Sequence, residues 1–186
     1  MTHSFEIIIF YKYTHVTDPQ AFMLWTKHLC ESLKIKGRIL IAQEGINGSV
    51  EGTPEQIASF ETSLQETPYG DFKDLWFKSS PGTGSAFRKL KVKARSTILN
   101  IGLEDEDINP NQLTGTHIQA EELHKWFEQA EDFEIIDMRN EYEYAVGRFK
   151  SSIDPKMTNF RDLKQVLPSL EHLKKKKILT VCTYGV

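Results

Sequence analysis

The stretch from residue 37 to residue 51 decides the fold of the first hundred residues, and it reads GRILIAQEGINGSVE. Residues 38–42 are mostly aliphatic, which predicts a buried strand. Gly45 and Gly48 then predict a tight turn, and residues 49–51 continue as a returning strand. The stretch therefore predicts a hairpin at the centre of a sheet.

The residues before this hairpin predict one strand and one helix. Residues 5–11 form an apolar, β-branched run that is typical of a buried strand. Asp18 is placed to cap a helix whose first residue is Pro19, and Gly37 is placed to end it.

The residues after the hairpin repeat the pattern of helix and strand. Residues 53–56 read TPEQ, which is the capping-box pattern of a helix start. Further strands are predicted at residues 74–78 and 89–94. Strand, helix, two strands, helix and strand follow one another as in ferredoxin-like domains, so we assign residues 1–100 to a ferredoxin-like α+β domain.

Residues 101–116 have the composition of a linker, with four consecutive acids followed by Pro110 and Gly115. Residues 117–186 then predict an α/β domain. Its expected elements are an amphipathic helix near residues 120–130, a strand at 133–137, a short helix capped by Asn140, a helix at about 161–173 and a buried strand at 178–181.

Reactive side chains follow the two predicted strands of the second domain. Asp137 and Arg139 come at the end of one strand, and Cys182 follows the other. Ligands of open α/β sheets bind beyond the carboxyl ends of the strands. A loop of backbone N–H groups at such a site stabilises a thiolate or an anion, so Cys182 is the candidate nucleophile or persulfide carrier.

Several motifs resemble one family. The run DMRNEYEY at residues 137–144, followed by Gly147-Arg148-Phe149, resembles the first half of rhodanese domains, and VCTYGV at 181–186 resembles the start of the rhodanese active-site loop. The run GRILIAQEGING at 37–48, FRKLKVKAR at 87–95 and NFR at 159–161 resemble the rhodanese-containing tRNA uridine 5-hydroxylase family (TrhO, formerly YceA). The resemblance covers essentially the whole chain.

This resemblance implies an acylphosphatase-like domain joined to a rhodanese domain. It implies oxygen-dependent hydroxylation of the wobble uridine of tRNA, with Cys182 as the essential cysteine, and molecular oxygen as co-substrate. The family loop has glycine where Tyr184 stands, and it continues beyond Val186. Rhodaneses usually have histidine at the position of Arg148. We therefore expect a rhodanese domain cut short within its loop, and a chain that is inactive in this form.

Other interpretations of these residues stay open. Cys182 could be an ordinary buried cysteine. Asp137 could cap a turn while Arg139 pairs with Glu143, which would make all three architectural supports of the rhodanese fold. At the level of function, the alternatives are a sulfurtransferase that carries persulfide sulfur on Cys182, and a non-enzymatic RNA-binding module.

A basic segment is the candidate RNA-binding surface. Lys89, Lys91, Lys93 and Arg95 alternate with apolar residues, which places four cations on one face of a strand. Such a face can simply be solvated, or it can bind phosphates. Arg38 and Arg88 are expected to extend it.

Composition sets the remaining limits. The chain has 186 residues and a formal net charge of −3. Its share of hydrophobic residues, 39%, is typical of globular proteins. Two distant cysteines make neither a disulfide framework nor a zinc site, and no metal or flavin motif is visible. No apolar run is long enough to span a bilayer. We expect a cytoplasmic protein with tRNA, and neither DNA nor membrane, as its partner.

Overall fold

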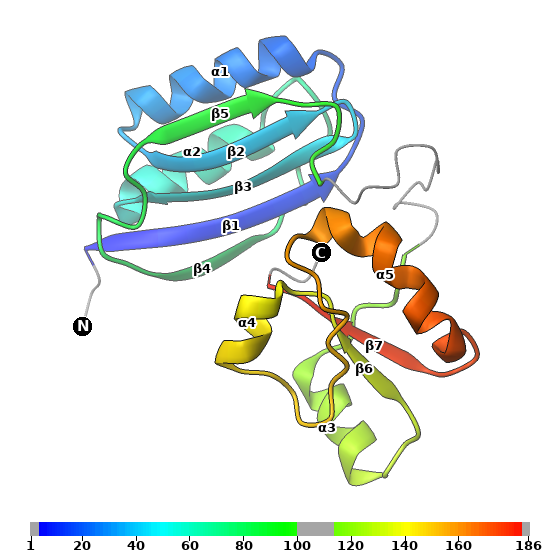
Figure 1. The fold of residues 1–186 in the computed structure, drawn as a ribbon. Coiled ribbons are helices and arrows are strands. Elements are labelled where there is room, and N and C mark those ends of the chain that lie inside the picture. The colour runs from blue at the N-terminus through cyan, green and yellow to red at the C-terminus, as the bar shows by residue number, and fades with distance from the viewer. Residues whose placement is uncertain (1–3, 100–113, 184–186) are drawn as a thin grey trace. The chain divides into compact units, whose positions relative to one another are not determined.

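The computed structural model describes residues 4–99 and 114–183. The chain divides into two compact units, Met1–Leu99 and Asn100–Val186 (Figure 1). Most of the predicted linker at 101–116 lies outside the described residues, as does Tyr184.

The first unit is one five-stranded sheet with two helices (Figure 1). Strands β1 and β3 pair antiparallel, as do β1 and β4, and β2 and β3, whereas β5 runs parallel to β2. The strand order β4-β1-β3-β2 is that of the ferredoxin-like fold, with β5 added at one edge, so the predicted fold class of this unit is confirmed. The elements are β1 (Phe5–Tyr13), α1 (Pro19–Ser32), β2 (Lys36–Ala42), β3 (Gly45–Gly52), α2 (Pro54–Gln65), β4 (Phe77–Gly82) and β5 (Leu90–Ala94).

Local capping chemistry starts both helices where the sequence predicts. The Asp18 carboxylate accepts hydrogen bonds from the backbone N–H groups of Gln20 and Ala21, which have no partner inside the helix. Thr53 and Gln56 form the reciprocal capping box of α2. Both helices then bury aromatic and aliphatic side chains against the sheet.

The glycines of the central hairpin have structural roles that differ from the predicted ones. Helix α1 ends at Ser32, and Lys34, with a φ of 56°, makes the left-handed turn, so Gly37 does not end the helix. Gly37 lies within β2, where a Cβ would come within 2.3 Å of the Ser49 carbonyl oxygen. Gly48 lies within β3 under the Phe10 ring. Close approach of neighbouring groups, which a Cβ would block, explains the glycines at 37 and 48.

The strand predicted at residues 74–78 is wrong in position, because β4 covers Phe77–Gly82. Asp74 lies in a turn, where its carboxylate pairs with Lys12. The end of β4 is polar and contains Pro81, so it gives no strand pattern. Pro81 is tolerated because β4 is an edge strand.

The second unit is an α/β arrangement around two parallel strands (Figure 1). It contains α3 (Ala120–Glu128), β6 (Glu134–Asp137), α4 (Glu141–Val146), α5 (Leu163–Leu170) and β7 (Ile178–Val181), with 3₁₀ turns at Phe160–Asp162 and Glu171–Leu173. The helix predicted over 161–173 is thus three pieces. Pro168 lacks the N–H that would continue the ladder, and α5 extends only two residues beyond it.

Candidate functional site

The candidate site lies at the carboxyl ends of β6 and β7. Because the strands are parallel and Asp137 is paired with Val181, both ends meet at the same edge, and Cys182 is the next residue. The Met138 N–H donates to the Val181 carbonyl at 2.8 Å, which keeps the two strand ends together. A hollow of about 410 Å³ opens there, lined by Arg139, Gly147, Arg148, Phe149, Val181, Cys182 and Thr183.

A buried ion pair fixes one wall of this hollow. Asp137 is fully buried, and its two carboxylate oxygens accept hydrogen bonds from Arg139 Nε at 2.9 Å and Arg139 Nη2 at 2.7 Å. The same Nη2 donates to the Gly147 carbonyl at 2.6 Å. These bonds from the guanidinium hold the pKa of Asp137 below its usual value. The fork geometry leaves the guanidinium with one orientation, beside the hollow.

Glu143 has a different partner from the one considered from sequence. Among the described residues, Arg139 is ion-paired with Asp137, and an Arg139–Glu143 salt bridge is absent, so that alternative is wrong. Glu143 instead closes the capping box of α4 with Asn140, as its spacing predicts. Its other oxygen accepts a hydrogen bond from Thr183 Oγ1 at 2.6 Å, which ties the residue after Cys182 to α4.

Arg148 and Phe149 also line the hollow and were not chosen from sequence as site residues. The Arg148 guanidinium carbon lies 4.8 Å from the centre of the Tyr144 ring, within cation–π range. The Tyr144 hydroxyl donates to the Ser152 carbonyl at 2.7 Å, so the ring is held in place. The sequence could have identified them, because they belong to the Gly147-Arg148-Phe149 segment, which resembles rhodanese domains.

The two cysteines differ in a way that bears on chemistry. Cys182 is only partly buried and lines the hollow with two arginines, which suits a nucleophile that meets an anionic substrate. Cys30 is fully buried in α1, and burial raises the pKa of its thiol to about 12. Cys30 therefore packs the core of the first unit.

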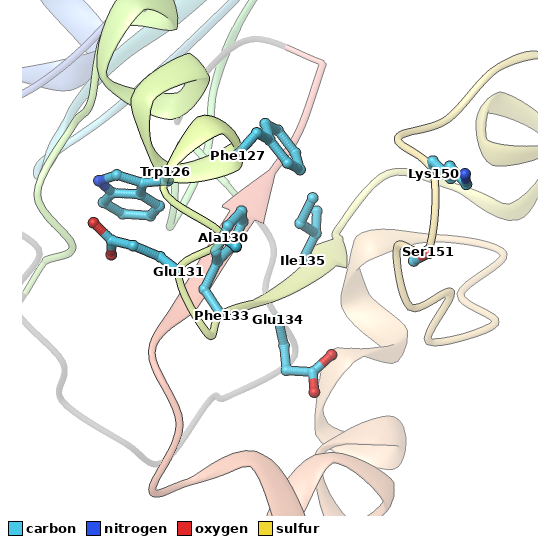
Figure 2. A pocket seen from close by; sticks show the side chains of 9 residues that line it. All are labelled: Trp126, Phe127, Ala130, Glu131, Phe133, Glu134, Ile135, Lys150 and Ser151. Carbon is cyan, nitrogen blue, oxygen red and sulfur yellow. The ribbon is translucent and has the colours of Figure 1, made fainter.

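A second hollow is lined by residues of α3, of the segment that follows it and of residues 150–151, and three of its lining residues are aromatic. Figure 2 shows Trp126, Phe127 and Phe133 on one side and Lys150 on the other. Its two carboxylates, from Glu131 and Glu134, are ion-paired with lysines. Cys182 does not line this hollow, and lines the first one instead.

The predicted RNA-binding residues lie on or beside the β2–β5 edge of the first sheet. Arg38 lies on β2 directly beside Lys91 of β5, and Lys93 lies beside Leu40. Lys89 and Arg95 flank β5 rather than belong to it. Arg88 precedes them, and all six side chains are exposed.

The described residues contain no group of three or more His, Cys, Asp or Glu side chains that could hold a metal ion. Within the same residues, no helix is long and apolar enough to cross a bilayer.

Fold and site together define a class of protein in which an acylphosphatase-like sheet precedes an α/β unit with a cysteine at a strand end. The sequence model of the UPF0176 acylphosphatase-like domain matches residues 5–98. The chain belongs to the UPF0176 family.

Curated relatives resemble the chain over its whole length. It is 39% identical over 187 residues to a protein of Bacillus licheniformis named tRNA uridine(34) hydroxylase, and 39% identical over 183 residues to one of the same name from Bacillus cytotoxicus. These matches cover 100% and 98% of this chain but 57% and 55% of the relatives, so the chain spans about half their length.

Among solved structures, acylphosphatase from Bacillus subtilis matches with a TM-score of 0.40 and 13% identity. The match covers 48% of this chain and 98% of that one.

Proposed function

We propose that this chain is part of an enzyme that hydroxylates the wobble uridine of tRNA to 5-hydroxyuridine, with Cys182 as its essential cysteine and molecular oxygen as co-substrate. The observation that most supports this proposal is the position of Cys182. It lies at the carboxyl end of β7, in one hollow with Arg139 and Arg148. The name that the curated relatives share, tRNA uridine(34) hydroxylase, supports the choice of reaction and substrate.

The second unit acts in this proposal as a rhodanese domain. Two parallel strands, a reactive cysteine after one of them and the Asp137–Arg139 pair after the other support this assignment. Asp137 acts as a positioning residue, because it holds Arg139 through two hydrogen bonds. Glu143 is a second positioning residue, since it holds Thr183 beside the sulfur.

Arg148 suits a substrate that carries negative charge, because it is exposed and forms no salt bridge with a described residue, whereas Arg139 is paired with Asp137. A guanidinium offers a planar set of donors that matches a phosphate. In the proposed reaction a phosphate beside the uridine lies against Arg148, which brings the base toward the thiol. In this proposal the basic residues of the first unit bind another part of the same RNA. The protein acts in the cytoplasm.

The proposal is tested by mass spectrometry of tRNA nucleosides from cells that lack the gene. The native gene is returned with no change, with Cys182→Ser, or with Cys30→Ala as the matched control. We expect hydroxyuridine to return with the unchanged gene and with Cys30→Ala, and to stay absent with Cys182→Ser. Hydroxyuridine that returns fully with Cys182→Ser would remove the cysteine from the reaction.

A sulfurtransferase gives a different result in the same cells and in solution. If the hydroxyuridine content does not depend on the gene, and the purified protein forms thiocyanate from thiosulfate and cyanide only when Cys182 is present, the sulfur-transfer alternative replaces hydroxylation. If neither product appears and tRNA still binds, the RNA-binding alternative replaces both.

A further inference from the structure

The five-stranded sheet of the first unit has one face covered by α1 and α2, and a second face, here called the open face, that no described helix of this unit covers. Helix α1 packs against β5 and β2, and α2 packs against β1 and β3 (Figure 1). Ile8 and Phe10 of β1 belong to the core beneath these helices. Ile7, Ile9 and Tyr11 alternate with them, lie outside that core and are partly exposed. Alternation along a strand places these three side chains on the opposite face.

The register of the strands shows which residues share this open face. Tyr11 lies opposite Asn47, and Asn47 lies opposite Leu40, which is beside Lys93. One row across the sheet is therefore Tyr11, Asn47, Leu40 and Lys93. The next row, read the same way, is Lys78, Ile9, Ser49, Arg38 and Lys91. Both rows are uncharged in the middle and basic at the β2–β5 edge.

Within residues 4–99 and 114–183, no salt bridge neutralises the positive charge on this face. Lys78, Arg38, Lys91 and Lys93 are exposed, and none of them forms a salt bridge with a described residue. Two described acids lie at this face, and both accept hydrogen bonds from backbone N–H groups. Glu51 is 4% exposed and accepts from Thr83, Gly84 and Ala86, and Glu44, beside Tyr13, accepts from Ile98. Uncompensated cations along a sheet edge are the electrostatic pattern that binds a phosphate backbone.

Two chain segments border the open face at its ends. At one end the connection from β4 to β5 is held by Glu51, which accepts hydrogen bonds from Thr83, Gly84 and Ala86. At the other end the Asn47 amide donates to the Ile98 carbonyl at 3.3 Å, and Ile98 N–H donates to Glu44 at 2.7 Å. The Glu51 bonds hold one segment beyond the row of Ser49, and the Asn47 bond holds the other segment against the row of Tyr11 itself.

We propose that this open face binds the single-stranded part of the tRNA, with a base stacked on Tyr11 and phosphates on Arg38, Lys91 and Lys93. Aromatic rings beside a basic groove are the means by which proteins hold unpaired bases. Tyr13 follows two residues along the same strand, opposite Gly45, and offers a place for the next base. This inference rests on the proposed function, because it takes tRNA as the ligand.

The test measures the affinity of the native protein for a fluorescent anticodon stem–loop RNA and for a blunt RNA duplex of matched length. The variants are Tyr11→Leu, Tyr11→Trp, and Arg38→Gln with Lys91→Gln. The control is Lys27→Gln with Lys73→Gln, which removes the same charge from α1 and from an exposed turn. Thermal unfolding of each variant checks that it is folded.

Stacking and charge have separate signatures in this experiment. We expect Tyr11→Leu to bind the stem–loop on the order of tenfold more weakly with an unchanged salt dependence, and Tyr11→Trp to restore binding. We expect the double charge variant to lower the slope of log affinity against log salt by about 2, one for each lost phosphate contact. The control variant keeps both affinity and slope.

Three results would overturn the inference. They are unchanged stem–loop affinity in both Tyr11→Leu and the double charge variant, tighter binding of the duplex than of the stem–loop, and no RNA binding by the native protein. The first two leave the hydroxylation of tRNA in cells untouched, so failure of this surface can be told apart from failure of the proposed function.

Discussion

At the scale of single residues, the pair Asp137–Arg139 shows what sequence cannot decide. The strand end predicts that both side chains lie at the site, but the sequence left open whether Arg139 pairs with Glu143. Only the structure shows that Asp137 is fully buried and accepts hydrogen bonds from the Arg139 guanidinium. Glu143 accepts a hydrogen bond from Thr183 instead. Burial decides the partner, because a buried carboxylate without a cation is far more costly than an exposed one.

This pair makes the stability of the second unit depend on acid. The lowered pKa of Asp137 means that its contribution is fully present above the pKa of an unfolded aspartate, about 3.9, and is lost as the pH falls through the lower folded value. We expect Asp137→Asn to cost about 3 kcal/mol at neutral pH, because it leaves Arg139 without its charge partner. Urea unfolding of both proteins from pH 7 downward should show the difference shrinking below about pH 4.

Asp132→Asn is the control for that measurement, since Asp132 is exposed just before β6 in the same unit. A difference between wild type and Asp137→Asn that stays constant down to pH 2 would contradict the assigned role of the charge.

Glu51 is a second buried carboxylate, and its replacement should lower the stability of the first unit. Its carboxylate accepts three backbone N–H groups at 2.7–2.9 Å, from Thr83, Gly84 and Ala86. Glu51→Gln replaces one acceptor oxygen by an N–H₂ group that faces a donor, so we expect a loss of about 2 kcal/mol in the free energy of unfolding. Glu66→Gln, at an exposed position after α2, should change it by less than about 0.5 kcal/mol. Equal losses in the two variants would argue against the anchoring role of Glu51.

At the scale of elements, the sequence predicted what local chemistry controls. Helix starts at Asp18 and Thr53 follow from side chains that satisfy neighbouring N–H groups, and the structure has them at those residues. Strand β4 and the broken helix near Pro168 were placed wrongly. The limits of β4 depend on its edge position and on a turn anchored by Lys12, which is distant in sequence. The end of α5 depends on Pro168, which lacks the N–H that would continue the helix.

The capping box of α2 gives a prediction at this scale. Thr53→Ala removes the acceptor of the Gln56 N–H, and we expect a loss of about 1 kcal/mol in the free energy of unfolding. Thr62→Ala is the control, because Thr62 lies inside the same helix and bonds only to its own helix through the Ala58 carbonyl. Chemical denaturation of both variants measures the two costs, and a Thr62→Ala loss as large as that of Thr53→Ala would remove the special role of the cap.

At the scale of the whole molecule, the two units differ in how much they bury. The first unit has a continuous core of residues at most 3% exposed, whereas α3, α4 and α5 of the second unit contain no fully buried residue. Few buried apolar contacts mean a low cost of local opening. We therefore expect hydrogen exchange in this chain to be slowest in β1 and β3 and much faster in α3 and α5.

Mass spectrometry of exchanged peptides checks this order. Slower exchange in α5 than in β3 would contradict it, and loss of protection in both units at one denaturant concentration would show that they unfold as one body.

The strand order of the first unit has one more consequence, for the behaviour of many molecules together. Both outer strands are poor templates for a strand from another chain: Pro81 in β4 offers no N–H, and Lys91 and Lys93 on β5 bring charges that repel a copy of themselves. The lysines that we propose for RNA thus also act as a guard against aggregation. A variant with valine at both Lys91 and Lys93 should therefore be less soluble and bind RNA more weakly. Its lower solubility should not depend on whether tRNA is present.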